Sequence, residues 1–415
     1  MITKLENNYS YLIPLLFIFP LLRENLISFT VILLTINTIV YCVLNKKFIL
    51  NAKVMVFTIP FWIILINNLL DFENINGFLP AKNAILFLII PVLFANIPES
   101  NFSEKKVNFY FKILQYTLFV IAITYYCSFF YYYDFKDLFV YKYKIPKFRD
   151  FIYNEVPFFK IHPTYYTSIT IFSIAHSFDR LINYKNKLEL FFIAFFSFTI
   201  VIFLAKLNIV FLAIMLMYFI FFKLQISKKY KSIIIISLVM FSISSLNYIP
   251  GIKNRFLEMT TSYQKAPTGM AYDSTNIRVS IIECSIELVK NNFWSGIGYS
   301  KIENRLLECY SSNYKSDFYK NKKYLTHNYF MYIVLGGGVF ALLIYLLYVY
   351  AVFLKIKSIG SITFTIAMIN IFLVNFTEDF FFRQKGLFYF SLLFFTYLKV
   401  KNEFVNNRLD IVKEQ

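Results

Sequence analysis

The chain has 415 residues, of which 58% are hydrophobic and only 16% are charged, and its mean hydropathy is +0.57. This composition excludes an ordinary soluble domain. The apolar residues gather in stretches near bilayer length, which predicts an all-α polytopic membrane protein. The net charge of +18 requires no nucleic acid partner, because basic loops of a membrane protein fix its orientation and meet anionic membrane lipids.

The hydropathy pattern predicts about twelve transmembrane helices. They are placed at residues 9–22, 27–44, 52–70, 84–97, 107–133, 163–178, 188–205, 207–223, 232–249, 328–354, 360–376 and 386–399. With both termini in the cytoplasm, most short basic loops also lie there, as the positive-inside rule requires, although the outer segment 134–162 carries six basic residues. The first stretch lacks a small-residue cleavage site and is therefore read as a span, not as a signal peptide.

Two outer positions between the early spans carry residues of interest. His162 precedes Pro163, which suits the first turn of a helix, so His162 is expected at the outer interface as an anchor or as a substrate-binding residue. Lys206 stands in the very short outer turn between the spans 188–205 and 207–223. It either extends to the lipid interface or meets an anion in an outward-facing cavity.

The largest outer segment, 250–326, is predicted as a loop inserted between spans nine and ten of a single membrane domain, 1–415. Asp273-Ser274-Thr275 offers N-caps for an amphipathic helix that carries Ile277, Ile281, Cys284 and Leu288 on one face and Arg278 in its first turn. Gly296 and Gly298 then suggest a tight turn, and the stretch 310–323 reads as a polar lid. Cys284 and Cys309 lie in the same outer segment. They either form a disulfide, which an oxidising compartment would permit, or remain two unpaired thiols, and the sequence does not decide between these alternatives.

His327 lies where the chain re-enters the membrane, just before the glycine-interrupted stretch 335–340. Histidine changes charge near neutral pH, so a histidine at this boundary is a candidate for proton transfer. Arg278 borders the same face, and only eight of the 42 basic residues are arginine, the residue suited to bidentate phosphate binding. The alternative is structural, with Arg278 paired to a loop carboxylate and His327 anchoring its helix.

No motif for a metal or a cofactor is present. There is no His-x-x-x-His or Cys-x-x-Cys pair, no phosphate-binding or dinucleotide-binding glycine motif, and the acidic residues Glu378 and Asp379 are adjacent in sequence and do not face one another. The sequence therefore predicts no metal and no cofactor, and a substrate that arrives already activated.

In their order and spacing, these motifs resemble the O-antigen ligase and O-antigen polymerase superfamily of bacterial membrane glycosyltransferases. Its hallmarks are an Arg-bearing helix, a Gly-x-Gly turn and a His-Asn pair before a glycine-rich span, which correspond here to Arg278, Gly296 and Gly298, and His327-Asn328 before Gly336 to Gly338. The motif-level similarity covers about residues 200–385. This chain departs from the family pattern with Lys206 in place of Arg, Phe293 in place of Pro and Ile282 in place of Trp.

The resemblance implies a C-type glycosyltransferase fold in the bacterial cytoplasmic (inner) membrane with its active face in the periplasm. It implies metal-independent, inverting transfer of a glycan from an undecaprenyl diphosphate carrier to an acceptor hydroxyl of a glycan, a lipid A core or a protein. His327 would be the catalytic base, Arg278 and Lys206 would bind the diphosphate, and His162 is a further substrate-binding candidate.

Other functions remain open at this point. Ligase, polymerase and protein glycosyltransferase share the donor chemistry, and the many tyrosines and phenylalanines of the outer segments favour polymerase. A transporter or flippase of lipid-linked glycans would also suit about twelve spans, although such proteins usually place charges near the bilayer midplane. A scaffold role predicts no effect of replacing Arg278 or His327.

Overall fold

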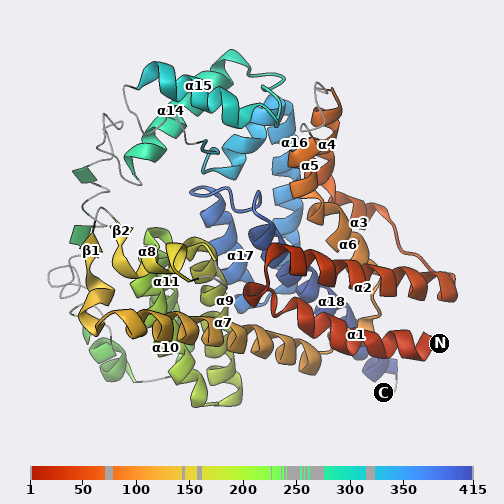
Figure 1. The fold of residues 1–415 in the computed structure, drawn as a ribbon. Helices are drawn as coiled ribbons and strands as arrows, with labels where there is room; N and C mark the ends of the chain where they lie inside the picture. Colours follow the sequence, from red (N-terminus) through yellow and green to blue (C-terminus); the bar gives the residue numbers. More distant parts are fainter. Residues whose placement is uncertain are drawn as a thin grey trace. The chain divides into compact units, whose positions relative to one another are not determined.

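The structure is a computed structural model, and it is almost entirely helical (Figure 1). It describes residues 2–70, 78–142, 145–156, 161–225, 227–234, 275–314 and 323–413, with a few single positions between 236 and 261. The chain divides into two compact units. One comprises Met1–Leu114, Pro267–Tyr272 and Ser280–Gln415, and the other Gln115–Ala266 and Asp273–Val279. The predicted all-α class is confirmed.

Over the described residues, the N-terminal part of the first unit consists of α-helices and short 3-10 turns. They are α1 (Ile2–Leu16), η1 (Phe19–Leu21), α2 (Glu24–Asn45), α3 (Ala52–Val56), α4 (Ile59–Leu70), α5 (Leu79–Ala84), α6 (Leu86–Asn96), η3 (Glu99–Phe102) and the start of α7 (Glu104–Tyr132), up to Leu114. Helices α1 and α2 lie side by side (Figure 1) and are joined by polar pairs, Asn8 with Asn37 and Tyr9 with Thr38. Asn96 bonds the backbone of Ile49 through both its oxygen and its nitrogen and so fixes the loop before α3.

The C-terminal part of this unit holds the residues with the strongest motifs. Its elements are α15 (Ile302–Asn313), α16 (Tyr329–Ile359), α17 (Ile362–Asn375) and α18 (Gln384–Lys413), preceded by most of α14 (Asn276–Asn291). Helix α18 contacts α6, α16 and α17, and its side chains from Leu387 to Phe394 are buried, which makes it the core of the unit. The predicted polar lid lies partly at 315–322, outside the described residues.

The second unit is built around α9 (Pro163–Tyr184), in which every side chain from Tyr165 to Phe178 is buried. The other elements are the second half of α7 (Glu104–Tyr132), η4 (Phe135–Phe139), the paired two-residue strands β1 (Tyr141–Lys142) and β2 (Ile145–Pro146), α8 (Lys147–Asn154), α10 (Leu188–Phe203), α11 (Lys206–Tyr218) and the π-helical turn η5 (Phe219–Lys223). Helix α9 contacts α10 and α11. The buried Glu189 pairs with Arg180 and accepts a hydrogen bond from Gln115, so this buried charge is satisfied.

Among the described residues, five helical segments are long and apolar enough to cross a membrane. They are Glu24–Asn45, Leu79–Asn96, Glu104–Tyr132, Lys206–Lys223 and Tyr329–Ile359, and Ile59–Leu70, Leu188–Phe203 and Ile362–Asn375 are shorter apolar helices. The protein is thus a multi-pass membrane protein. The predicted ninth span, 232–249, lies largely outside the described residues, and the count of about twelve stays a prediction.

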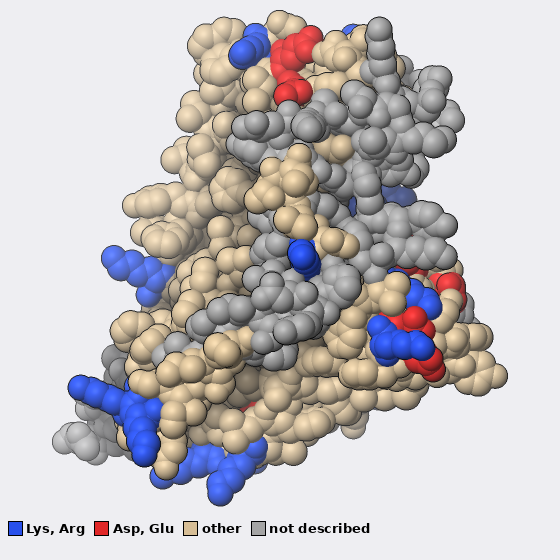
Figure 2. Space-filling model, turned by 90° about the vertical axis from the view of Figure 1, so that its left-hand side faces the viewer, with Lys and Arg blue, Asp and Glu red and all other residues tan. Residues whose placement is uncertain are grey.

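Large apolar side chains on the surface support this assignment. Helix α2 exposes Phe29, Ile32 and Ile36, each by more than half, and α16 exposes Phe340 and Leu347 to a similar degree. On the face drawn in Figure 2, the described side chains are mostly uncharged, and the charged ones form small separate groups. Large apolar side chains exposed along a helix are typical of helices that contact lipid.

Candidate functional site

The loop that follows α14 is bonded to the backbone of α16 through the Gly-x-Gly turn. The amide of Ile297 donates to the carbonyl of Leu335 at 2.7 Å, and that of Gly298 donates to Gly336 at 3.0 Å. In a regular helix the amide of Val339 would donate to Leu335, four residues earlier. Here it donates to Phe293 at 2.9 Å, because the helix is kinked at Gly338. The loop therefore supplies hydrogen-bond partners for backbone groups of α16 that have none within the kinked helix.

Two of these glycines cannot be replaced without strain. Gly296 and Gly338 have φ angles of +71° and +72°, and a Cβ atom on Gly338 would lie 2.0 Å from the carbonyl oxygen of Trp294. A Cβ on Gly296 would lie 2.6 Å from the backbone of Leu335 and Gly336. The glycines noticed in the sequence are thus required by the close approach of two backbones.

We expect Gly338→Ala to destabilise the protein strongly. The left-handed backbone alone costs about 1–3 kcal/mol for a residue with a side chain, and the contact with Trp294 adds to this. Gly360→Ala is a control for positive φ, because Gly360 has a φ of +70° but no atom within 4 Å of the added Cβ, although its ψ of 10° differs from that of Gly338. Thermal unfolding of the two purified variants measures the difference. Equal melting temperatures would contradict the proposed contact between loop and helix.

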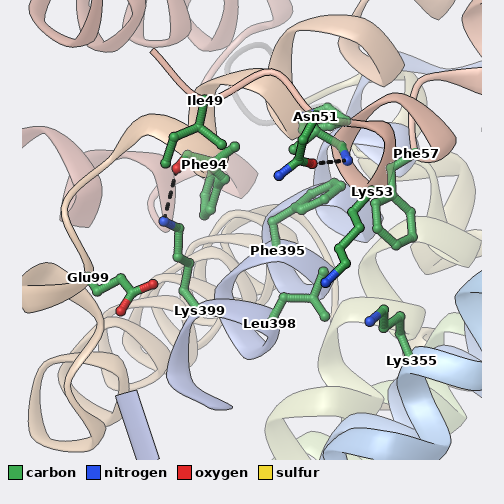
Figure 3. A pocket seen from close by; sticks show the side chains of 13 residues that line it. Ile49, Asn51, Lys53, Phe57, Phe94, Glu99, Lys355, Phe395, Leu398 and Lys399 are labelled. Carbon is green, nitrogen blue, oxygen red and sulfur yellow. Dashed lines mark hydrogen bonds between the residues drawn. The ribbon is translucent and has the colours of Figure 1, made fainter. Parts of the chain in front are cut away.

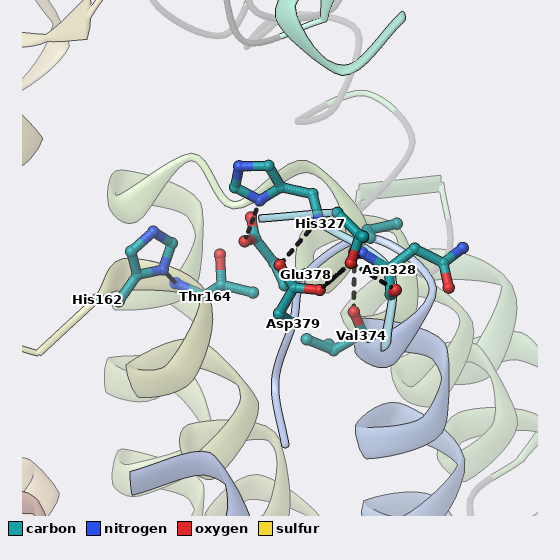
Figure 4. Close-up of polar contacts among 9 residues, drawn as sticks. His162, Thr164, His327, Asn328, Val374, Glu378 and Asp379 are labelled. Carbon is teal, nitrogen blue, oxygen red and sulfur yellow. Dashed lines mark hydrogen bonds and ion pairs between the residues drawn. The ribbon is translucent and has the colours of Figure 1, made fainter. Parts of the chain in front are cut away.

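The segment 326–328 is held by Asp379, in the loop between α17 and α18 (Figure 4). The carboxylate accepts three hydrogen bonds, from the Thr326 hydroxyl at 2.5 Å, the His327 amide at 2.8 Å and the Asn328 amide at 3.2 Å. These bonds hold His327 in a left-handed conformation, with φ of +46°. Burial raises the pKa of the Asp379 carboxyl, and the nearby His327 and the bond from Thr326 act in the opposite direction.

The neighbouring acid, Glu378, contacts the imidazole itself. Its Oε2 lies 3.0 Å from Nδ1 of His327, and both side chains are only partly exposed (Figure 4). A carboxylate at Nδ1 favours the tautomer in which Nδ1 carries the proton and Nε2 is an acceptor. Asn328 begins α16 as its N-cap, with its side-chain oxygen accepting from the Met331 amide. The ring is therefore oriented by one acid while its backbone is fixed by the other.

In the second unit, Lys206 reaches the start of α14. It is the first residue of α11, and its Nζ donates to the hydroxyl of Thr275 at 3.1 Å. Arg278, half-buried, lies three residues after Thr275 in the first turn of α14, as the sequence predicted. A cation at a helix N-terminus is opposed by the helix dipole, and an anion bound there would relieve this repulsion. The caps proposed at Asp273 and Ser274 lie outside the described residues.

His162 is the N-cap of α9. Its Nδ1 accepts a hydrogen bond from the Thr164 amide at 3.3 Å, Pro163 follows in the first turn, and the ring contacts Tyr153 and Tyr165 edge-on. These contacts are those of a helix anchor. A role of His162 in substrate binding stays a prediction.

Cys284 and Cys309 are bonded to one another. Cys284 of α14 and Cys309 of α15 form a disulfide with a Cα–Cα distance of 5.9 Å, which settles the two readings left by the sequence. Cys284 lies on the buried face of α14 with Ile281, on the predicted apolar stripe. The bridge ties the Arg-bearing helix to the helix that precedes the His327 segment in the chain.

The sequence thus placed His327, Arg278 and Lys206 on their elements but missed Glu378 and Asp379. The structure brings His327 together with the two acids inside the first unit, and brings Lys206 to the start of α14 inside the second. The sequence pattern excludes these adjacent acids as a metal site and gives no histidine partner for them. One available signal was their position just beyond the predicted span 360–376, at the same membrane boundary as His327.

No curated protein matches the chain. Residues 191–346 match a family model described as O-antigen ligase. This range contains Lys206, Arg278, the Gly-x-Gly turn, His327 and the kink at Gly338, whereas Glu378 and Asp379 follow it. Over residues 191–346, the chain is therefore similar to the O-antigen ligase family.

Proposed function

We propose that the protein transfers a glycan from an undecaprenyl diphosphate carrier to an acceptor hydroxyl, at the periplasmic face of the bacterial inner membrane. The observation that carries this proposal is the arrangement around His327, whose ring is oriented by Glu378 while Asp379 fixes its backbone. A positioned neutral imidazole is the usual general base for a hydroxyl at neutral pH.

The proposed reaction is a single displacement without a metal ion. Nε2 of His327 takes the proton of the acceptor hydroxyl as its oxygen forms a bond to the anomeric carbon of the donor. The bond from that carbon to the diphosphate oxygen breaks, and the diphosphate leaves with the electron pair. Attack opposite to the leaving group inverts the anomeric configuration, and no covalent enzyme intermediate is formed.

Lys206 and Arg278 are proposed to bind the diphosphate. Both are cations at helix N-termini, where backbone amides also favour an anion. Charge that develops on the leaving phosphate would be stabilised by such fixed donors. The acceptor is a glycan, a lipid A core or a protein, and we favour a glycan, as in a polymerase.

We expect Lys206→Ala to lose most of the transfer activity and Lys206→Arg to retain or increase it, because the charge is the minimum requirement and arginine adds a bidentate fork. Initial rates with a lipid diphosphate-linked glycan measure this. Lys82→Ala, which removes an exposed lysine of α5, is the control and should keep the wild-type rate. Full activity of Lys206→Ala would mean that this lysine only meets the lipid interface.

A second readout separates the transferase from a flippase. Purified protein in detergent, where no bilayer separates two sides, should release one lipid diphosphate for each glycosidic bond formed. Absence of both products, with transport of the intact donor in vesicles, would overturn the proposal.

A further inference from the structure

A pocket of about 390 Å³ lies at the end of α16 far from His327, within the first unit (Figure 3). It is formed by α3, α6, α16 and α18, and Lys355 of α16 lines it. Lys355 follows Tyr329, at the start of the helix, by 26 residues. This corresponds to about 39 Å along a helix, enough to cross the roughly 30 Å hydrocarbon core of a bilayer. The pocket and the His327 site therefore belong to opposite membrane faces.

The pocket is lined by three lysines and one carboxylate. Lys53 and Lys355 point toward one another in Figure 3, and within the described part of the chain neither has an ion-pair partner. Lys399 is 9% exposed and is fixed by hydrogen bonds to the carbonyls of Ala95 and Ile97, at 3.2 and 2.9 Å. Cations that converge in this way repel one another unless an anion lies between them.

The rest of the lining is largely apolar and aromatic. Phe57 of the turn after α3, Phe94 of α6 and Phe395 of α18 line the pocket, and each is less than a tenth exposed. A hydrated inorganic anion gains nothing from such walls, whereas an acyl chain is stabilised by them. The lining therefore suits a ligand with an anionic head and an apolar tail.

We propose that this pocket binds an anionic phospholipid of the inner leaflet, with its phosphate between Lys53 and Lys355 and an acyl chain against the aromatic walls. Basic pockets between transmembrane helices on the cytoplasmic side commonly bind anionic headgroups. The site is separate from the proposed diphosphate site, and it does not depend on the reaction proposed above.

The test is lipid binding by the purified protein, measured by native mass spectrometry with phosphatidylglycerol and with phosphatidylcholine of the same acyl chains. We expect phosphatidylglycerol to bind more tightly. Each lysine near an anionic headgroup contributes about fivefold in affinity, so Lys53→Gln with Lys355→Gln should weaken phosphatidylglycerol binding by about 25-fold and leave phosphatidylcholine binding unchanged. The single variants should each lose about fivefold.

The control is Lys47→Gln with Lys357→Gln, which removes the same charge from exposed lysines that do not line the pocket. It should bind phosphatidylglycerol like the wild type. An equal loss in the control would show only a general charge effect, and wild-type affinity in the Lys53 and Lys355 variant would exclude the pocket; either result overturns the proposal. Displacement of the lipid by equimolar inorganic phosphate would also overturn it, because the site would then bind a free anion.

Discussion

Replacing His327 by alanine is expected to reduce glycan transfer by about 10²- to 10⁴-fold, the usual contribution of a general base. The side chain is only partly buried, so its removal should leave the protein folded and able to bind the lipid diphosphate. The wild-type rate should fall as the pH is lowered, because a protonated imidazole cannot accept the hydroxyl proton. This acid limb should be missing from the residual activity of the variant.

The rates require purified protein, a lipid diphosphate-linked glycan and a series of pH values, with donor binding measured in parallel. Arg278→Lys serves as the comparison. Lysine keeps the positive charge but cannot bind the phosphate through two parallel N–H donors, so this variant should bind the lipid diphosphate donor more weakly while glycan transfer persists. Transfer by His327→Ala at the wild-type rate would place the base elsewhere, with His162 the next residue to examine.

Asp379→Ala is expected to cost both activity and stability. It leaves the amides of His327 and Asn328 without their shared acceptor, whereas the Thr326 hydroxyl can still donate to the carbonyl of Asn328. Each unsatisfied buried donor costs about 1–3 kcal/mol. His327 would also lose the contact that holds its left-handed backbone. We expect a lower melting temperature and a loss of transfer comparable to that of His327→Ala.

Glu378→Gln is the matched comparison. Glu378 contacts the ring of His327, and its replacement keeps the side-chain shape, so the melting temperature should change little. The transfer rate should still fall about 10- to 100-fold, because a hydrogen bond to a charged group contributes about 1.5–3 kcal/mol. Unchanged stability and rate in Asp379→Ala would show that the carboxylate does not position the histidine.

The membrane helices could be predicted because long apolar stretches have few alternative structures. The helix of Arg278 was predicted from its periodicity and begins at Asn276, close to the expected caps. The kink at Gly338 could not be derived, although the glycines marked an interruption, because its partners at 293–298 lie about 40 residues earlier in the chain. Hydrophobic periodicity and turn motifs report on neighbouring residues and do not reveal hydrogen bonds between segments this far apart in the chain.

The acids beside His327 were missed for a related reason. Adjacent residues in a helix or strand point in different directions, and Glu378 and Asp379 do so in their loop, one toward the imidazole and the other toward the backbone. A metal site needs side chains that point toward the same ion, so a pair that points in two directions does not match its pattern. What they share is a single residue, His327, more than 50 positions earlier in the sequence.

The exchange of hydrogen bonds at the kink limits how this protein can be recombined with its relatives. A chimera that replaces only the outer loop would have to supply amides in register for the carbonyls of Leu335 and Gly336 and an acceptor for the amide of Val339. Without them, three backbone groups would be left unsatisfied inside the bilayer boundary. Residues 293–299 and the first half of α16 therefore have to be exchanged together, as a single unit.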